Sequence, residues 1–292
     1  MASETVGLMA ALIRNRNSRA LNRDMTGFAL DIPERVVDRV GILAYAKATG
    51  DDNPAYTGEG AVAPPFYLSG LVYDQLKLIL THRELGLNLL RMVHGEQEVI
   101  WHMPVRVGDS IRGRVFIKEI RDTPAGEMMT VSVQGIVKNR VAAEALMGFL
   151  VRGTGRRPAP VMRAAGEEPV REEVFRTEIR TWEGQQLSYA VVSGDNNFIH
   201  TSTFLAKVAG LPRTILHGVC FMAMCCSSLT RQLLADDLTR LKLIRGRFSA
   251  YVLPGQTLSL VGYTPLTRGE QPFAVFNGSG QAVMKNGLFI FR

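Results

Sequence analysis

The chain has 292 residues, which is long for a single core and typical of two domains. Hydrophobic residues make up 46% of it and charged residues 21%, so the composition excludes a disordered or coiled-coil protein. The formal charge of +7 comes from dispersed Lys and Arg residues without a nucleic-acid motif. We therefore expect no nucleic-acid partner, whereas a phosphorylated small ligand suits this modest positive excess.

Neither a membrane anchor nor a secretion signal is evident in the sequence. The longest apolar stretch, Ile215–Leu229, falls short of the ~20 residues that a membrane span needs. The N-terminal segment has no continuous apolar run followed by a cleavage signal. We expect a cytoplasmic protein with no membrane partner, with an organelle transit peptide as the alternative. Cys220, Cys225 and Cys226 lack zinc-site spacing, and we expect buried, reduced thiols.

The first half of the chain predicts one helix followed by an antiparallel run of strands. The helix is expected from Pro65 to about Leu85. Enrichment in β-branched and aromatic residues predicts four strands, at Glu96–Met103, Ser110–Ile120, Met128–Val137 and Ala142–Val151. Gly and Pro residues then predict a linker over 152–169, between domains at 1–151 and 170–292.

The second half repeats this order of elements. A helix from Gly218 to about Leu234 is apolar nearly all round, so it should be buried. Strands are expected at Leu241–Val252, Thr257–Tyr263, Pro272–Phe276 and Ala282–Phe291. The predicted fold class is α+β, with a curved antiparallel sheet around one long helix in each half.

Two segments of the chain resemble each other, which indicates an internal duplication. The segment that begins at Tyr45 aligns without a gap on the segment that begins at Tyr189, an offset of 144 residues. The alignment superposes Tyr, Gly, the first Asp and an Asn. Gly108 corresponds to Gly255 at the similar offset of 147 residues. We expect two copies of one fold, packed side by side like the subunits of a dimer.

One stretch of the second copy carries a specific motif. It reads Ser193-Gly194-Asp195-x-Asn197-x-Ile199-His200, followed by Ala206 and then by His217-Gly218 at the start of the helix. This pattern resembles the MaoC-like hydratases, also called R-specific enoyl-CoA hydratases or hydratase 2, which have a hot-dog fold. The specific part of the resemblance covers residues 189–220, while the layout matches along the whole chain.

The resemblance implies a double hot-dog fold and a lyase that needs no cofactor and no metal. Such an enzyme adds water to a trans-2-enoyl thioester to give a (3R)-3-hydroxyacyl thioester, or catalyses the reverse dehydration. The acyl group would be carried by coenzyme A or by an acyl carrier protein. The first half would then be a degenerate hot-dog domain, and the second half the catalytic one.

The chemistry of hydration supports four catalytic candidates. A base must take a proton from water, an acid must supply one to the α-carbon, and a donor must stabilise the enolate-like oxygen. Asp195 is the candidate base or proton carrier, with His200 sharing its water, and the sequence leaves open which residue moves which proton. Asn197 would orient Asp195 or the water. The backbone N–H of Gly218, at a helix N-terminus, would polarise the carbonyl.

The substrate-binding candidates are Ser193, Gly194, Phe198 and His217. Phe198 replaces the family's usual proline, and we expect it to line the acyl pocket. A Gly-Asp-x-Asn string by itself is commonly a turn, and His217 by itself is more typical of a structural neighbour at a helix N-cap. The scattered histidines His82, His94 and His102 are expected at the surface or at hydrogen-bonded core positions.

The first copy keeps Asp51 and Asn53 but carries Tyr56 in place of the histidine. Because a tyrosine has a reference pKa near ~10, it exchanges protons poorly at neutral pH. We expect this copy to be inactive and to shape the pocket. Two other functions stay open: a hot-dog thioesterase, or a non-catalytic acyl-binding subunit if Phe198 blocks the pocket. Further association into a homodimer through sheet edges is also possible.

Overall fold

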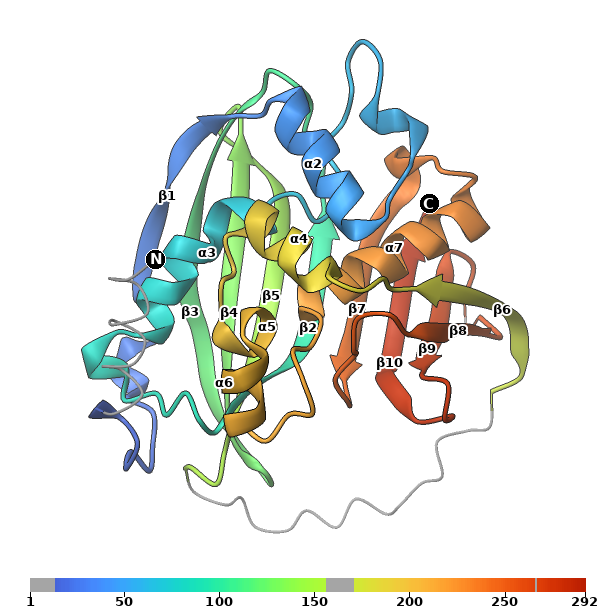
Figure 1. Ribbon diagram of the computed structural model, residues 1–292. Helices are drawn as coiled ribbons and strands as arrows, with labels where there is room; N and C mark the ends of the chain where they lie inside the picture. Colours follow the sequence, from blue (N-terminus) through green and yellow to red (C-terminus); the bar gives the residue numbers. More distant parts are fainter. Residues whose placement is uncertain (1–13, 156–170, 266) are drawn as a thin grey trace.

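The computed structural model describes residues 14–155, 171–265 and 267–292 (Figure 1). Both halves follow one order: an outer strand, helices, and four further strands. The first half contains η1 (Arg23–Met25), β1 (Ala29–Val36), α2 (Arg39–Thr49), η2 (Pro54–Tyr56), α3 (Ser69–Leu80), η3 (Arg83–Leu85), β2 (Met92–Trp101), β3 (Ser110–Thr123), β4 (Gly126–Val137) and β5 (Arg140–Arg152). The second half contains β6 (Glu173–Arg180), α4 (Gln185–Ser193), α5 (Phe198–Thr201), α6 (Thr203–Val208), α7 (Gly218–Leu234), η4 (Leu238–Arg240), β7 (Leu241–Phe248), β8 (Thr257–Tyr263), β9 (Glu270–Phe276) and β10 (Ala282–Phe291).

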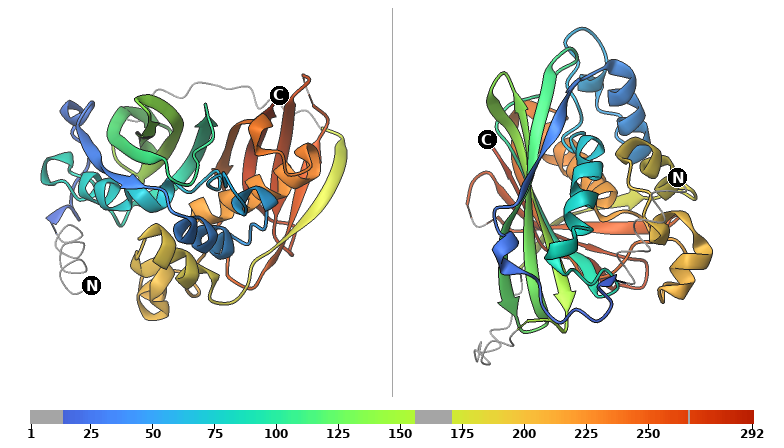
Figure 2. Two further views of the ribbon diagram at one scale, coloured as in Figure 1. Left: turned by 90° about the horizontal axis from the view of Figure 1, so that it is seen from above. Right: turned by 90° about the vertical axis from the view of Figure 1, so that its left-hand side faces the viewer.

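The strands form one antiparallel sheet of ten strands, in the order β1-β3-β4-β5-β2-β7-β10-β9-β8-β6. The order of the first five strands is repeated in reverse by the last five. The two halves join where β2 pairs with β7, with Glu98 opposite Arg245 and Val99 opposite Ile244. The sheet curves, and the helices lie along one face of it (Figure 2). This is the α+β double hot-dog architecture that the sequence predicts.

The duplication is visible in equivalent contacts of the two copies. The hydroxyl groups of Tyr45 and Tyr189, which align in the sequence, lie 3.2 Å apart between α2 and α4. The N–H of Val37 donates to the carbonyl oxygen of Asp109, and the N–H of Thr181 donates to that of Gln256, each at 2.9 Å. A pseudo-twofold axis therefore passes near the tyrosine pair and between β2 and β7.

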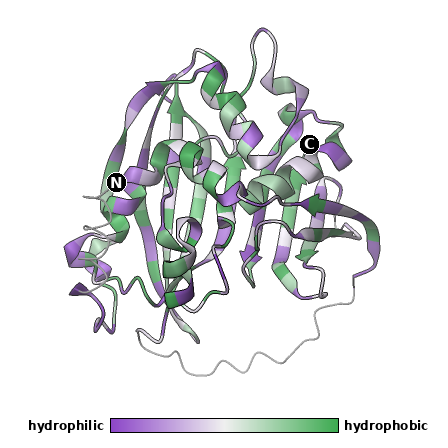
Figure 3. Ribbon diagram, viewed as in Figure 1, coloured by the Kyte–Doolittle hydropathy of each residue, from purple (hydrophilic) through white to green (hydrophobic). Residues whose placement is uncertain are grey.

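The helix α7 lies in the core of the second half, as its sequence predicts. It packs with the inner faces of β7, β8, β9 and β10 in one hydrophobic cluster. The strands behind it carry mainly apolar residues (Figure 3). Its three cysteines, Cys220, Cys225 and Cys226, are buried and unpaired, and burial raises the pKa of each thiol. No helix of the described part of the chain is long and apolar enough to span a membrane.

Some predicted element bounds differ from the structure. The helix predicted from Pro65 begins at Ser69, after a turn, and ends at Leu80, because Pro64 and Pro65 provide no backbone N–H groups and favour the turn. The strand predicted to reach Val252 ends at Phe248. The structure also adds the outer strands β1 and β6. Each has one side exposed to solvent and carries charged residues, so the apolar pattern of an inner strand is missing.

The predicted linker over 152–169 lies mostly outside the described residues. Its first residue, Arg152, still belongs to β5. The positions of the predicted domain boundaries therefore remain predictions.

Candidate active site

The end of α4 forms the loop that presents Asp195. Gly194 caps this helix in the left-handed conformation, with φ of 73°, which glycine adopts at little cost. The Ser193 hydroxyl donates to the carbonyl oxygen of Tyr189 at 2.8 Å and accepts from the N–H of Asp195 at 3.2 Å. Ser193 and Gly194, predicted to contact substrate, thus shape the turn.

The carboxylate of Asp195 is held by its own loop. Its Oδ1 accepts from the backbone N–H of Asn197 at 3.1 Å. The side-chain oxygen of Asn197 instead accepts from the N–H of Ile199 at 3.3 Å and caps the short helix α5. Asn197 therefore orients Asp195 through its backbone, whereas the sequence suggested its side chain. The side chain of Asp195 is 28% exposed, which leaves the carboxylate accessible.

His200, on α5, is buried and held in one orientation. Its Nδ1 lies 2.8 Å from the carbonyl oxygen of Ile215. Since a carbonyl oxygen only accepts, Nδ1 must carry the proton, and the neutral ring then presents an acceptor at Nε2. Burial lowers the pKa of His200, against the opposing influence of Asp195. The ring is therefore neutral at pH 7.

His217 is the N-cap residue of α7 and stacks on His200, with ring centroids 3.7 Å apart. Its Nε2 lies 2.9 Å from the carbonyl oxygen of Asp195, to which it donates. Burial and the adjacent His200 lower the pKa of His217 to about 3. This ring therefore joins the two catalytic candidates by fixing the Asp195 backbone and packing on His200. His217 is therefore uncharged at pH 7 and positions the other two residues.

Asp195, His200 and His217 form one cluster, in which one ligand atom from each lies within 4.8 Å of the others. One water can lie between such groups, because its two O–H bonds, about 105° apart, donate hydrogen bonds of ~2.8 Å to acceptors ~4.4 Å apart. Such a water would donate to the Asp195 carboxylate and to Nε2 of His200. The same spacing would also admit a divalent cation, although Nε2 of His217 is already committed to a peptide carbonyl.

Gly218 begins α7, a helix of 17 residues whose N-terminus has no side-chain cap. The backbone N–H groups of such an uncapped end, together with the helix dipole, favour a partial negative charge. A Cβ atom on Gly218 would lie only 3.2 Å from the ring of Phe248 and 3.6 Å from Nδ1 of His94. Glycine at this position lets Phe248 and His94 pack closely against the start of the helix.

His94 is a residue that the sequence did not place at the site. It lies on β2 of the first half, and its ring contacts Phe149 and Phe248 at centroid distances of 5.1 Å. Its Nε2 is enclosed. The half-buried position of His94 and its hydrogen bonding to the backbone of Glu96 and the side chain of Gln97 agree with the expected surface or hydrogen-bonded core position, but its place beside Gly218 was not expected. Only the pairing of the two halves brings it to Gly218, and no spacing in the sequence signals this.

The equivalent carboxylate of the first half is closed off. Oδ2 of Asp51 accepts from the Tyr56 hydroxyl at 2.5 Å, and Oδ1 accepts from the Ser227 hydroxyl at 2.9 Å. Burial raises the pKa of Asp51, while the bond from Tyr56 opposes the shift. Both carboxylate oxygens are used by protein hydroxyls. This contact pattern supports the prediction that the first half is inactive.

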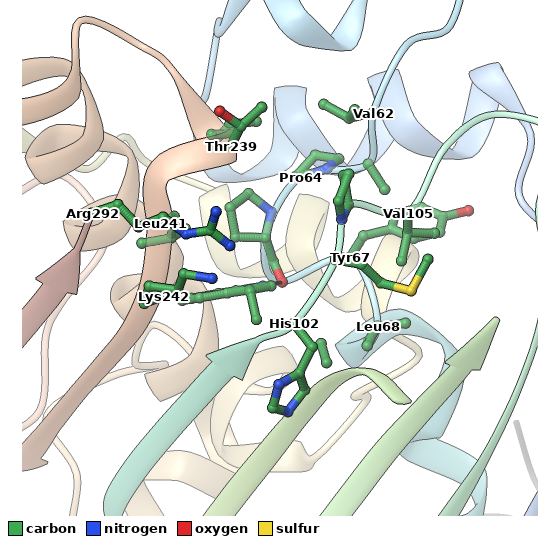
Figure 4. Close-up of a pocket in the computed structure, with 17 residues that line it drawn as sticks. Val62, Pro64, Tyr67, Leu68, His102, Val105, Thr239, Leu241, Lys242 and Arg292 are labelled. Carbon is green, nitrogen blue, oxygen red and sulfur yellow. Dashed lines mark hydrogen bonds between the residues drawn. The ribbon is translucent and has the colours of Figure 1, made fainter. Parts of the chain in front are cut away.

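A cavity of about 110 Å³ lies between the halves, beside η4 and the start of β7 (Figure 4). Its walls include Pro64, Tyr67 and Leu241, and Lys242 and Arg292 add positive charge. None of the catalytic candidates lines it. Phe198, which was expected to line the acyl pocket, begins α5 and is partly buried. We therefore do not assign this cavity as the acyl pocket.

The fold and the site together define a double hot-dog protein with an acid/base loop beside the N-terminus of a buried helix. The MaoC like domain matches residues 164–263, and the FAS1-like dehydratase domain region matches residues 24–145. The chain belongs to the MaoC-like dehydratase family, which includes the hydratase 2 proteins.

Known proteins support this assignment at moderate identity. The chain is 30% identical to 3-hydroxyacyl-thioester dehydratase Y of Mycobacterium tuberculosis over 65% of its length and 66% of the relative's. It is 40% identical to the peroxisomal enoyl-CoA hydratase 2 of Arabidopsis thaliana over 31% of its length and 29% of the relative's. The matches span less than two thirds of either relative. A MaoC-like dehydratase structure from Phytophthora capsici superposes with a TM-score of 0.79 and 25% identity, over 93% of this chain and 98% of that one.

Proposed function

We propose that the protein is a hydro-lyase that interconverts a trans-2-enoyl thioester and a (3R)-3-hydroxyacyl thioester. The observation that carries the proposal is the position of the Asp195 and His200 pair beside Gly218 at the open end of α7. The thioester would be an acyl-CoA or a carrier-protein thioester. The names of the two relatives above, a dehydratase and a hydratase, support a reaction of this class.

In the hydration direction, one water lies between the carboxylate of Asp195 and Nε2 of His200. Its oxygen attacks C3 of the enoyl group while one of its protons passes to the Asp195/His200 pair. The pair then delivers this proton to C2, so that the hydroxyl group on C3 and the hydrogen on C2 together account for the water. Dehydration follows the same path in reverse.

Negative charge develops on the thioester carbonyl oxygen as C3 is attacked. The N–H of Gly218 stabilises this oxygen together with the dipole of α7, because both are oriented before the reaction begins. The carbonyl group can approach closely since Gly218 has no side chain. The oxygen-stabilising group is thus on the helix, and the proton-transfer groups are on the preceding loop.

The reaction class is tested by incubating the protein with crotonyl-CoA. The absorbance of the enoyl group and the release of free thiol are measured in the same reaction. We expect the absorbance to fall without thiol release, and a longer or branched enoyl-CoA replaces crotonyl-CoA where the short chain is not accepted. Thiol release would identify a thioesterase and contradict the proposal. Inactivity on the whole panel of enoyl thioesters would favour a binding function.

Removal of divalent metals is expected to leave the activity unchanged. The proposed pair completes the proton transfers, and His217 is occupied by the Asp195 carbonyl group. The measurement is the hydration rate after dialysis against EDTA, compared with a sample dialysed without it. A loss of activity that a divalent ion restores would show that the Asp195, His200 and His217 cluster holds a metal.

A further inference from the structure

The first half contributes a polar side chain to the helix end where the carbonyl group is expected. Nδ1 of His94 lies 3.6 Å from the position that a Cβ of Gly218 would take. Nε2 of the same ring is enclosed, and the backbone of Glu96 and the side chain of Gln97 are hydrogen-bonded to this histidine. Nδ1 is the nitrogen that an oxygen atom of a ligand beside Gly218 would meet.

The distance allows both donors to reach one oxygen atom. Standard backbone geometry places a Cβ ~2.5 Å from its own backbone nitrogen, so Nδ1 of His94 lies at most ~6 Å from the nitrogen of Gly218. A carbonyl oxygen, whose lone pairs lie about 120° apart, accepts two N–H···O bonds of ~2.9 Å from nitrogens ~5 Å apart. This separation lies within the upper bound, so the geometry permits a thioester oxygen at the end of α7 to accept from the helix and from His94 together.

The electrostatic state of His94 suits a donor. Burial lowers its pKa to about 4, against the opposing influence of the hydrogen bond with the Glu96 backbone, of the nearby Asp195 and of the hydrogen bond with Gln97. The ring is therefore neutral at pH 7 and carries one N–H, whose position is set by the acceptor that it meets. A carbonyl oxygen at Nδ1 selects the Nδ1–H tautomer. A neutral imidazole can polarise a carbonyl group without bringing a full positive charge into an apolar site.

We propose that His94 donates the second hydrogen bond to the thioester carbonyl oxygen, beside the backbone N–H of Gly218. This assignment rests on the proposed hydro-lyase function. Residues of both halves then form the catalytic site. The second half supplies the acid/base loop and the helix, and the first half supplies a side chain that stabilises the carbonyl oxygen. The first half then has a direct chemical role although Asp51 is closed off.

The test compares His94→Phe, which keeps a ring but removes the donor, with His94→Gln, which keeps a donor of similar reach. The matched control is His102→Phe, at an exposed residue just beyond the same strand. For an accepted enoyl-CoA, we expect His94→Phe to lower kcat by ~10²–10³-fold, as for other losses of one oxyanion donor. His94→Gln should recover most of this loss. Affinity for the saturated acyl-CoA should change little.

A second readout does not depend on turnover. A saturated acyl-CoA labelled with ¹³C at the carbonyl group reports its hydrogen bonding by infrared difference spectroscopy. The bound C=O stretch should lie at lower frequency in the wild type and His94→Gln than in His94→Phe. A shift that depends on His94 in a protein without hydratase activity would support the assignment and refute the proposed reaction.

Three results would overturn the assignment. The first is a wild-type protein that hydrates the enoyl-CoA while His94→Phe has the same kcat. The second is an equal loss in His94→Phe and His94→Gln together with lowered thermal stability, which would indicate a packing role. The third is the absence of any bound acyl-CoA signal in the wild type.

Discussion

Replacing Asp195 with Asn, or His200 with Gln, is expected to lower kcat by ~10²–10⁴-fold, the range typical of general acid/base groups. The amide of Asn cannot accept the proton of the attacking water. Gln at position 200 can still form a hydrogen bond, but it cannot exchange a proton. The measurement is steady-state hydration of an accepted enoyl-CoA by purified variants, each first shown to be folded by circular dichroism.

The internal duplication provides the matched control for this prediction. Asp51→Asn changes the equivalent carboxylate, and Tyr56→Phe changes the residue that aligns with His200. We expect both variants to keep kcat near the wild-type value, since the Asp51 oxygens are already occupied by the hydroxyls of Tyr56 and Ser227. A shift in KM alone is expected if the first half lines the acyl pocket. If Asp51→Asn were as damaging as Asp195→Asn, the assignment of one active half would be wrong.

The sequence could predict those features that depend on neighbouring residues. The loop from Ser193 to His200 is local, so its motif indicated both the turn and the acid/base candidates. The apolar character of α7 predicted its burial, because a helix without a polar face must be enclosed. The offset between Tyr45 and Tyr189 predicted the duplication, and the contact of their hydroxyl groups in the core confirms it.

Features that depend on the pairing of the two halves could not be predicted in the same way. His94 stands on a strand far from the motif, and only the β2–β7 pairing brings it to Gly218. The outer strand β6 was missed because one side faces solvent and the strand carries charged residues. The capping of α5 by the Asn197 side chain was not foreseen, because the sequence does not show whether an Asn side chain will cap a short helix or orient a neighbour. A role of Asn197 in orienting the water stays a prediction.

Lowering the pH from 7 to 4.5 is expected to destabilise the fold strongly, because three histidine rings at the site are enclosed in their neutral form. Burial lowers the pKa of His94 to about 4 and that of His217 to about 3, and it also lowers the pKa of His200. In the unfolded chain each ring titrates near ~6.5. Above that pH the rings are neutral in both states and do not affect the free energy of unfolding.

Below pH ~6.5 the unfolded chain binds protons that the folded chain excludes, so the free energy of unfolding falls by up to ~1.4 kcal/mol per pH unit for each such histidine. Three rings together can remove a large part of a total stability of ~5–15 kcal/mol. Asp51 acts in the opposite sense, since burial raises its pKa, and offsets part of the loss.

The measurement is the free energy of urea unfolding at pH 7.5, 6.0, 5.0 and 4.5. His217→Gln should flatten the pH dependence by about one proton, whereas His102→Gln, at an exposed position, should leave it unchanged. An unfolding free energy that is the same at pH 7.5 and 5.0 in the wild type would contradict the neutral, enclosed state of these rings and, with it, the assignment of His200 as an acceptor for the water proton.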